Sequence, residues 1–259
     1  MNLLEKTRKI TSFIQNQTGP RVEFDHIAKI LGEVIECNVY IFSSKGKTLG
    51  YSLLEPFEYE LLDKDIIQNR YFPKENEDWL LNIDETTANY KPEEGPVNVD
   101  DDNEYVSREK VITIIPIKGG GKRLGTLVLA KLEGSFSEDD LILGEYGSTV
   151  IAMEILRSES NKIEKEIRKK AEVQIALETL SYSELEALEG ILNELGKSEG
   201  LIVAGKVADE IGITRSVIVN ALRKMESAGV IESRSLGMKG TYIKVLNERL
   251  FEELEKVKI

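Results

Sequence analysis

Two kinds of hydrophobic periodicity alternate along the first part of the chain. Apolar residues recur every three to four positions in residues 1–16 and 24–36, which predicts two amphipathic helices. Residues 38–42 and 48–52 are short runs rich in strand-forming side chains, and the polar segment 43–47 between them predicts a hairpin turn. The chain therefore opens as helix, helix, strand, strand.

The middle of the chain combines further elements with segments that lack periodicity. We expect a helix over residues 56–69, an irregular excursion over 71–89 and an acidic loop over 91–104. Two near-continuous apolar runs, 111–117 and 124–132, predict central strands buried on at least one face. This order of elements is typical of an α/β (α+β) sensory domain of the GAF or PAS type, in which a sheet cups a small ligand.

A long helix is predicted to begin at Ser137 and to reach about residue 180. Its second half, residues 162–178, is highly charged and has only a thin apolar stripe, so we expect it to link two domains. A solvated face is the simpler account of its charges, and a dimer contact along this helix is the alternative. Ser183 and Glu186 have the spacing of a capping box, which predicts the start of the next helix. The predicted parts are a sensory domain over 1–155, a helical linker over 156–180 and a C-terminal domain over 181–259.

The C-terminal domain carries the most specific pattern. Two apolar-faced helices are expected on either side of Gly212, whose backbone freedom suits a sharp turn, with Ala208 at their close contact. Thr214 is expected to cap the second helix through its hydroxyl. Gly229 ends this helix, and a two-stranded hairpin follows within residues 230–245. The whole is typical of a winged helix-turn-helix.

The exposed face of the second helix and the wing carry residue types that recognise DNA. Arginine and asparagine side chains can read guanine and adenine edges in the major groove, and serine and lysine side chains suit phosphates. We therefore predict that this domain binds double-stranded DNA; a plain structural hairpin and a protein-binding module are the alternatives. The predicted contact residues are Ala204, Arg215, Ser216, Val217, Asn220, Arg223, Lys224, Arg234, Ser235 and Lys239.

Charge is distributed unevenly along the chain. The 259 residues have a formal net charge of −12. Residues 201–246 contain seven Lys and Arg against four Asp and Glu, a net charge of +3, and −12 less +3 leaves −15 for the remainder. Because an acidic remainder repels DNA, phosphate contact must come from one localised basic face, doubled in a homodimer.

Composition argues against several other functions. No run of about 18 apolar residues occurs, so no membrane span is expected. The single cysteine, Cys37, lies in a strand-like apolar run and favours a reducing, cytoplasmic location. The single histidine, His26, has no second histidine to join it in a metal or catalytic site. We therefore predict no catalytic residues, no metal site and no catalytic cofactor.

A nucleotide-binding enzyme is the main alternative to a DNA-binding regulator. Gly119–Gly121 invites a phosphate-loop interpretation, and with it GTP hydrolysis, because successive backbone N–H groups can cradle an anion. The segment lacks the order of residues of a Walker motif, and a β-like run rather than a helix follows it. A hairpin turn is therefore the preferred interpretation, and we predict that the chain is not an enzyme.

Five sequence blocks, spread over nearly the whole chain, carry a family signature. They are LLEKTRKI (3–10), GGGKRLGTL (119–127), DDLILGEYGSTVIAMEILR (139–157), LSYSELEA (180–187) and the long block 212–247. These blocks closely resemble the CodY family of bacterial global transcriptional regulators. The resemblance implies a GAF domain, a helical linker and a winged helix-turn-helix. It also implies a dimer that senses branched-chain amino acids, isoleucine above all, and GTP, and that mainly represses its genes.

The resemblance implies an amino-acid effector site. Its residues in this chain are Ile66, Arg70, Phe72, Pro73 and Val97, which would bind isoleucine, or valine or leucine. Segment 60–63 reads ELLD where the family places an arginine against the ligand carboxylate. In this chain Arg70, Arg108 or backbone N–H groups would have to replace that arginine.

A GTP site is implied at Val22, Phe24, Ser43, Lys45 and Glu154. Phe24 would stack on the base, Lys45 would meet phosphate and Glu154 would accept from the guanine edge. Core packing, a turn and a solvated helix are the ordinary alternatives for these three residues. Ligand binding is expected to order residues 91–108 and to shift the packing of the long helix, which would set the separation of two winged domains in a dimer.

Overall fold

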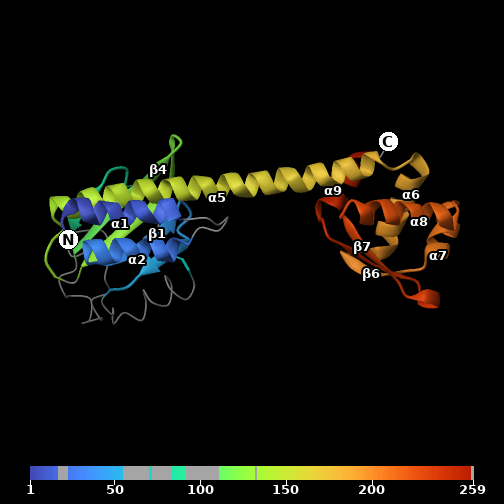
Figure 1. Cartoon of the computed structure of the whole chain (residues 1–259), viewed down its shortest axis with the longest axis horizontal. Helices are drawn as coiled ribbons and strands as arrows, with labels where there is room; N and C mark the ends of the chain where they lie inside the picture. Colours follow the sequence, from blue (N-terminus) through green and yellow to red (C-terminus); the bar gives the residue numbers. More distant parts are fainter. Residues whose placement is uncertain (17–22, 55–69, 72–82, 92–110, 132, 258–259) are drawn as a thin grey trace. The chain divides into compact units, whose positions relative to one another are not determined.

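The computed structural model divides into two compact units, Met1–Ser160 and Asn161–Ile259 (Figure 1). The predicted helix 56–69 and nearly all of the predicted loop 91–104 lie outside the described residues. Among the described residues, none of the helices combines the length and the apolar content that crossing a bilayer requires. The described residues are 1–16, 23–54, 70–71, 83–91, 111–131 and 133–257.

A five-stranded antiparallel sheet with the order β2-β1-β5-β4-β3 forms the centre of the first unit. The predicted strands are all confirmed. The sequence prediction was wrong in treating 71–89 as wholly irregular, because β3 lies partly within it. β3 has four residues, TANY, without a run of apolar side chains, and only its pairing with β4 defines it. The strands are β1 (Asn38–Ser43), β2 (Thr48–Ser52), β3 (Thr87–Tyr90), β4 (Val111–Gly119) and β5 (Lys122–Lys131).

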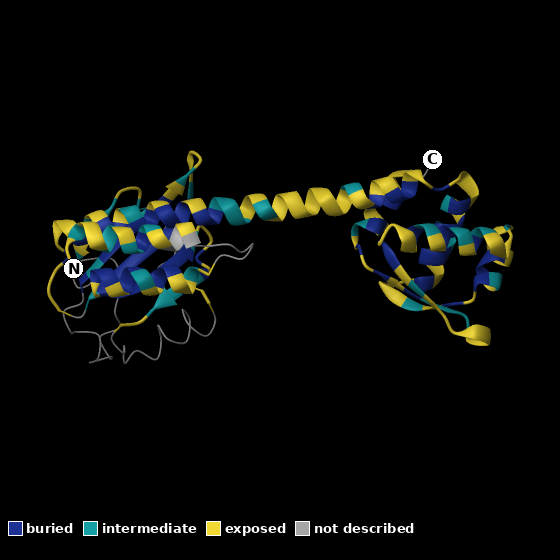
Figure 2. Cartoon of the chain, viewed as in Figure 1, coloured by how far each residue is buried: buried dark blue, intermediate teal, exposed yellow. Residues whose placement is uncertain are grey.

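Three helices supply the core on one face of this sheet: α1 (Leu3–Asn16), α2 (Phe24–Ile35) and the first part of α5 (Glu138–Glu178). All three were predicted. Small residues let α5 approach closely, since a Cβ at Gly147 would lie 2.6 Å from a methyl carbon of Leu31 on α2. Buried residues concentrate on the strands and on the inner faces of these helices (Figure 2).

The turn between β4 and β5 distinguishes the two interpretations of Gly119–Gly121, a phosphate loop and a hairpin turn. Gly120 and Gly121 have φ values of 59° and 77°, so both central residues of the turn are left-handed, as a two-residue type I′ hairpin requires. Lys122 already belongs to β5, and Gly119 pairs with it. The predicted hairpin is confirmed, and no helix begins here to bind an anion.

The second unit packs helices around a three-stranded antiparallel sheet with the order β6-β8-β7. The periodic sequence predicted α7, α8 and the two wing strands, whereas β6 and α9 were not predicted. The elements are α6 (Tyr182–Leu195), β6 (Glu199–Ile202), α7 (Ala204–Ile211), α8 (Arg215–Ser227), β7 (Ile231–Ser235), β8 (Thr241–Val245) and α9 (Arg249–Val257).

The capping box of α6 lies two residues before the predicted one. Ser181 accepts a hydrogen bond from the backbone N–H of Glu184, and the Glu184 carboxylate accepts from the backbone N–H of Ser181. Ser183 and Glu186, the predicted pair, are both exposed inside the helix. The capping box forms at Ser181 and Glu184 because the Glu184 carboxylate also accepts a hydrogen bond from the ammonium of Lys224 on α8. This hydrogen bond lowers the pKa of Glu184.

This difference in register gives a direct stability test. We expect Ser181→Ala to lower the free energy of unfolding by about 1 kcal/mol, because it removes a side-chain cap of a helix that supplies the core of the unit. Ser183→Ala is the matched control and should change stability by no more than about 0.5 kcal/mol. Urea unfolding followed by circular dichroism measures both. Equal losses for the two variants would show that Ser181 does not cap α6.

Candidate nucleic-acid interface and effector site

The helix-turn-helix is formed by α7 and α8 around a left-handed glycine. Gly212 has a φ of 75°, and the carbonyl of Ala208 accepts from the backbone N–H groups of Gly212 and, at 3.0 Å, Ile213. Thr214 occupies the N-cap position of α8, but its hydroxyl lies 2.8 Å from the Ser216 hydroxyl and makes no capping bond. The predicted turn is therefore confirmed, whereas the predicted hydroxyl cap is wrong.

Seven basic residues of the segment 201–246 separate into two groups. Lys206, Lys224 and Lys244 form ion pairs with Glu194, Glu184 and Glu199. The other four are exposed, and within the described residues none has an acidic group at ion-pair distance. Arg223 instead donates a 3.2 Å hydrogen bond to Asn220 on α8. The four cations without an acidic group at ion-pair distance are Arg215, Arg223, Arg234 and Lys239.

Three of the predicted contact residues are buried or half-buried and make their contacts within the unit. The Lys224 ammonium donates to the Thr179 carbonyl at 2.9 Å and to Glu184 at 2.7 Å, so it holds α6 and α8 together. Ala204 is buried at the start of α7, and Val217 packs partly against the core. These side chains position the helices. Ala204 can face a phosphate only through its backbone at a helix N-terminus.

The wing is a regular antiparallel hairpin. β7 and β8 pair over five residue pairs, from Ile231–Val245 to Ser235–Thr241. Gly240 has a φ of 112°, and a Cβ there would lie 2.3 Å from the Ile202 carbonyl oxygen, so β6 and the wing approach at a distance only glycine permits. Ser235 and Lys239 are exposed on either side of the tip. The wing thus presents polar groups next to the exposed face of α8.

The sheet of the first unit has a second apolar face, opposite its helices. Its described members are Tyr40, Phe42, Ile114, Val128 and Ala130. Thr126 is fully buried on β5 and lies opposite Phe42 in the register, and the half-buried guanidinium of Arg123 donates to the Thr126 hydroxyl at 2.9 Å. Burial lowers the pKa of Arg123. An apolar surface with a cation at its end suits a small ligand with a hydrocarbon body and an anionic group.

Of the predicted amino-acid site, only Arg70 belongs to the described residues. Its guanidinium lies 3.8 Å from the Asp25 carboxylate and over the ring of Tyr51, 5.5 Å from the ring centroid. Tyr51 is on β2, the edge strand, and its backbone N–H donates to Asp25. Arg70 therefore lies at the sheet edge beside the start of α2. The residues Ile66, Phe72, Pro73 and Val97, and the alternative Arg108, lie outside the described part.

The structure describes four residues of the predicted GTP site. Contacts relate three of them, Ser43, Lys45 and Glu154, to one end of the sheet. Ser43 accepts from the backbone N–H of Lys45 in the β1–β2 turn, and this turn adjoins β5 through a 3.0 Å bond from Ser44 N to Leu124 O. Leu124 and Leu156 both flank Gly119, so the part of α5 around Glu154 lies at the same end of the sheet. Glu154 is buried, 2.9 Å from Arg157. Phe24 starts α2 beside Gly50 of β2, and Val22 lies outside the described residues.

Cys37, the single cysteine of the chain, belongs to the first unit. It is buried, and burial raises its pKa to about 12, so the thiol stays protonated at neutral pH and serves packing. Within the described ranges, no group of three or more His, Cys, Asp or Glu side chains is arranged to hold a metal ion.

A sheet-based domain of the ligand-sensing type, followed by a helix-turn-helix with a wing, defines the class of the protein: a ligand-responsive transcriptional regulator. Two family models match the sequence. The "CodY GAF-like domain" matches residues 2–179 and the "CodY helix-turn-helix domain" matches residues 198–258. The chain belongs to the CodY family of global transcriptional regulators. It is a DNA-binding regulator and not an enzyme, which confirms both predictions.

Two bacterial relatives agree with this assignment over the full length of the chain. The chain is 55% identical to the global transcriptional regulator CodY of Anoxybacillus flavithermus over 258 residues, covering 100% of this chain and 99% of that protein. It is 54% identical to CodY of Lysinibacillus sphaericus over 259 residues, covering 100% of both. The solved cofactor-binding GAF domain of the nutrient sensor CodY from Clostridium difficile is 37% identical, with a TM-score of 0.41, and covers 59% of this chain and 97% of that one.

Proposed function

We propose that this protein is a homodimeric, cytoplasmic regulator that binds operator DNA, mainly as a repressor, and that branched-chain amino acids and GTP raise its DNA affinity. Isoleucine is the preferred amino acid, with valine or leucine as alternatives. The availability of nutrients would thereby control the regulated genes. The proposed parts are a sensory domain over 1–155, a linker over 156–180 and a DNA-binding domain over 181–259.

One observation carries the proposed DNA contact: within residues 201–246, all of which the structure describes, the cations that have no acidic group at ion-pair distance lie on α8 and the wing. Arg215 and Arg223 project from α8, and Arg234 and Lys239 from the wing, in a chain whose net charge is −12. A protein-binding module would not need this local excess of positive charge. Arginine with asparagine on one helix face favours readout of bases, and the serine and lysine of the wing favour phosphate contact.

The proposed amino-acid site rests on the second apolar face of the first unit. Phe42, Ile114 and Val128 offer a surface for a branched hydrocarbon side chain, and Arg123 beside Thr126 offers a cation and a hydroxyl for a carboxylate. The predicted residues Ile66, Phe72, Pro73 and Val97 would complete this site. Arg123 thereby joins Arg70 as a candidate partner of the ligand carboxylate.

The proposed GTP site rests on Ser43, Lys45 and Glu154, which contacts relate to one end of the sheet. Lys45 is exposed in the β1–β2 turn, where a triphosphate can reach it, and Phe24 is half-buried at the start of α2. Glu154 is engaged with Arg157, so guanine would have to compete for its carboxylate. We therefore propose Lys45 and Phe24 as the main GTP contacts, with Val22, Ser43 and Glu154 in supporting roles.

The proposed homodimer uses the exposed side of α5. Ile163, Ile167 and Ile175 are 60%, 63% and 64% exposed and follow one another at multiples of four residues. A row of exposed isoleucines at helical spacing is best covered by an apolar partner surface. Sedimentation equilibrium of the full chain at micromolar concentration should give twice the chain mass of 29.1 kDa, and a monomer would contradict this.

Effector control predicts a change in DNA affinity. We expect saturating isoleucine with GTP to tighten binding to a selected duplex by about 5- to 150-fold, the usual range for allosteric coupling. Fluorescence anisotropy of the labelled duplex measures this with the full chain, and calorimetry with isoleucine, valine, leucine and GTP separates the effectors. Alanine, which lacks the branched side chain, is the matched control ligand. Tight binding of duplex DNA that no effector changes would refute the proposed regulation.

A further inference from the structure

The C-terminal end of α5 is part of the core of the second unit. Val173, Ala176 and Leu177 are 0–3% exposed and belong to the same hydrophobic cluster as Leu250 and Leu254 of α9. Residues 162–170 of α5 are, by contrast, all exposed. Apolar packing therefore holds only the last turns of α5 in the second unit, and any earlier attachment must be polar.

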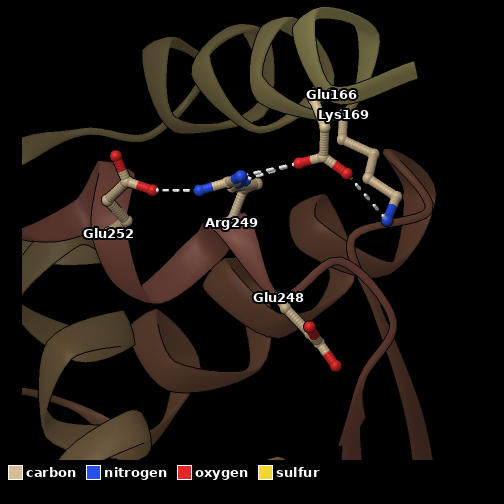
Figure 3. Close-up of a pocket in the computed structure, with 5 residues that line it drawn as sticks. All are labelled: Glu166, Lys169, Glu248, Arg249 and Glu252. Atoms are coloured by element: carbon tan, nitrogen blue, oxygen red, sulfur yellow. Dashed lines mark hydrogen bonds and ion pairs between the residues drawn. The ribbon is translucent and has the colours of Figure 1, made fainter. Parts of the chain in front are cut away.

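A polar attachment lies two turns before this apolar contact. Arg249, the first residue of α9, donates two hydrogen bonds to one carboxylate oxygen of Glu166 on α5, at 3.0 and 2.7 Å, and a third to Glu252 at 2.6 Å (Figure 3). With Lys169 and Glu248 these residues line an open, polar pocket of about 420 Å³. The hydrogen bond from Arg249 lowers the pKa of Glu166, so the pair is charged at neutral pH.

Two further polar contacts join the same two helices. The side chain of Glu253 is only 3% exposed, and its carboxylate accepts from Gln174 on α5 at 2.6 Å and from Lys256 at 2.7 Å. Asn247 is buried before α9, and its side-chain amide donates to the Lys169 carbonyl at 2.8 Å. Polar side chains that are buried and bridge two elements set the position of one element on the other.

We propose that Arg249 and Glu253 are positioning residues that hold α5 on the DNA-binding unit, so that a ligand-driven movement of α5 reaches α8. Glu166 and Gln174 are eight residues apart, which is about 12 Å along a helix. Two attachment points at this separation determine the direction of the helix axis, which the apolar contact at the end of α5 cannot do alone. This inference rests on the proposed effector control.

Energetics favours a positioning role over a stabilising one for Arg249. Its side chain is 42% exposed and that of Glu166 is 46% exposed. Exposed ion pairs contribute little to stability, because water screens them and two flexible side chains must be ordered to form them. The neighbouring pair Arg168–Glu164 is more exposed, at 69% and 68%, and lies wholly within α5, where it cannot attach the helix to another element. These two arginines therefore make a matched comparison.

The test measures effector response in the full chain. Duplex affinity is determined with and without saturating isoleucine plus GTP for Arg249→Ala, Glu166→Gln and Glu253→Gln, with Arg168→Ala as control. We expect the ratio of duplex affinity with effectors to duplex affinity without them to fall toward one in the first three variants. In the control this ratio should stay at the wild-type value. Affinity without effectors, and isoleucine affinity by calorimetry, should change less than about threefold. The double variant Arg249→Ala/Glu166→Gln should lose no more of the effector response than either single variant does, because both substitutions remove the same interaction.

The outcomes distinguish a failure of this inference from a failure of the proposed effector control on which it rests. A wild-type protein whose DNA affinity ignores the effectors would refute the effector control, and with it this inference. A responsive wild type whose Arg249→Ala and Glu253→Gln variants respond equally well would refute the inference alone. A fall in melting temperature with an unchanged response would show that these residues only stabilise the unit.

Discussion

Replacing Arg215 with alanine should weaken binding to a selected operator duplex by about 1–3 kcal/mol, roughly 5- to 150-fold, and should relax the choice of sequence. Arg215 is exposed at the start of α8 and has no ion-pair partner among the described residues. An arginine in this position can form two hydrogen bonds to a guanine edge, which a shortened side chain cannot replace. Competition between selected and scrambled duplexes measures the loss of specificity.

Lys239→Ala is the matched comparison for Arg215→Ala, since it removes one cation from the wing instead of the helix. It should weaken binding to all sequences alike and reduce the slope of log affinity against log salt by about one unit. Lys224→Ala should leave that slope unchanged, because Glu184 neutralises Lys224 within the unit. If all three variants lost affinity in parallel and with one salt dependence, the division into base-reading, phosphate-binding and structural cations would be wrong.

Gly125→Ala should destabilise the first unit by about 3 kcal/mol, the upper end of the cost of overpacking a core. Gly125 lies on the central strand β5, opposite Ser43 and Ile117 of its two neighbours. A Cβ at this position would lie 2.1 Å from the backbone oxygen of Phe42. Backbone in the middle of a sheet cannot move aside as the end of a flexible side chain can, so β1 would have to separate from β5.

Gly205→Ala is the control for this substitution. Gly205 lies in α7, and an added Cβ there would meet no atom within 4 Å. Since alanine favours helix over glycine, this variant should be neutral or more stable by up to about 1 kcal/mol. Urea unfolding followed by circular dichroism compares both variants with the wild type. A Gly125→Ala protein that unfolds at the wild-type midpoint would show that β1 and β5 are not as close as described.

Local patterns were sufficient where one face of an element is continuously apolar. The periodicity of α2 predicted its buried face, and the apolar runs around the hairpin predicted β4 and β5, because such segments bury the same side chains in almost any packing. Gly212 was recognised for a similar reason, since the left-handed backbone of a tight helix turn strongly favours glycine. β3 and β6 escaped prediction because each is four residues long and is defined by its partner strand.

The start of α6 shows where local rules become ambiguous. The segment LSYSELEA contains two Ser-x-x-Glu pairs, Ser181–Glu184 and Ser183–Glu186, and either satisfies the local pattern of a capping box. The structure uses the first pair, whose glutamate reaches Lys224 on α8. That partner is 40 residues away in the chain, so nothing near the helix start reveals the choice.

The sequence by itself determined the class of protein, the order of its two domains and the residue types on the DNA-binding helix, because periodicity and glycine turns are local properties. Only the tertiary structure decided which cations remain available to DNA. Lys224 was predicted to contact DNA together with Arg215 and Lys239, and Lys206 and Lys244 contribute to the same local excess of positive charge. Folding brings a glutamate to each of these three lysines. An ion pair depends on distance in space, and these partners are 12 to 45 positions away along the chain.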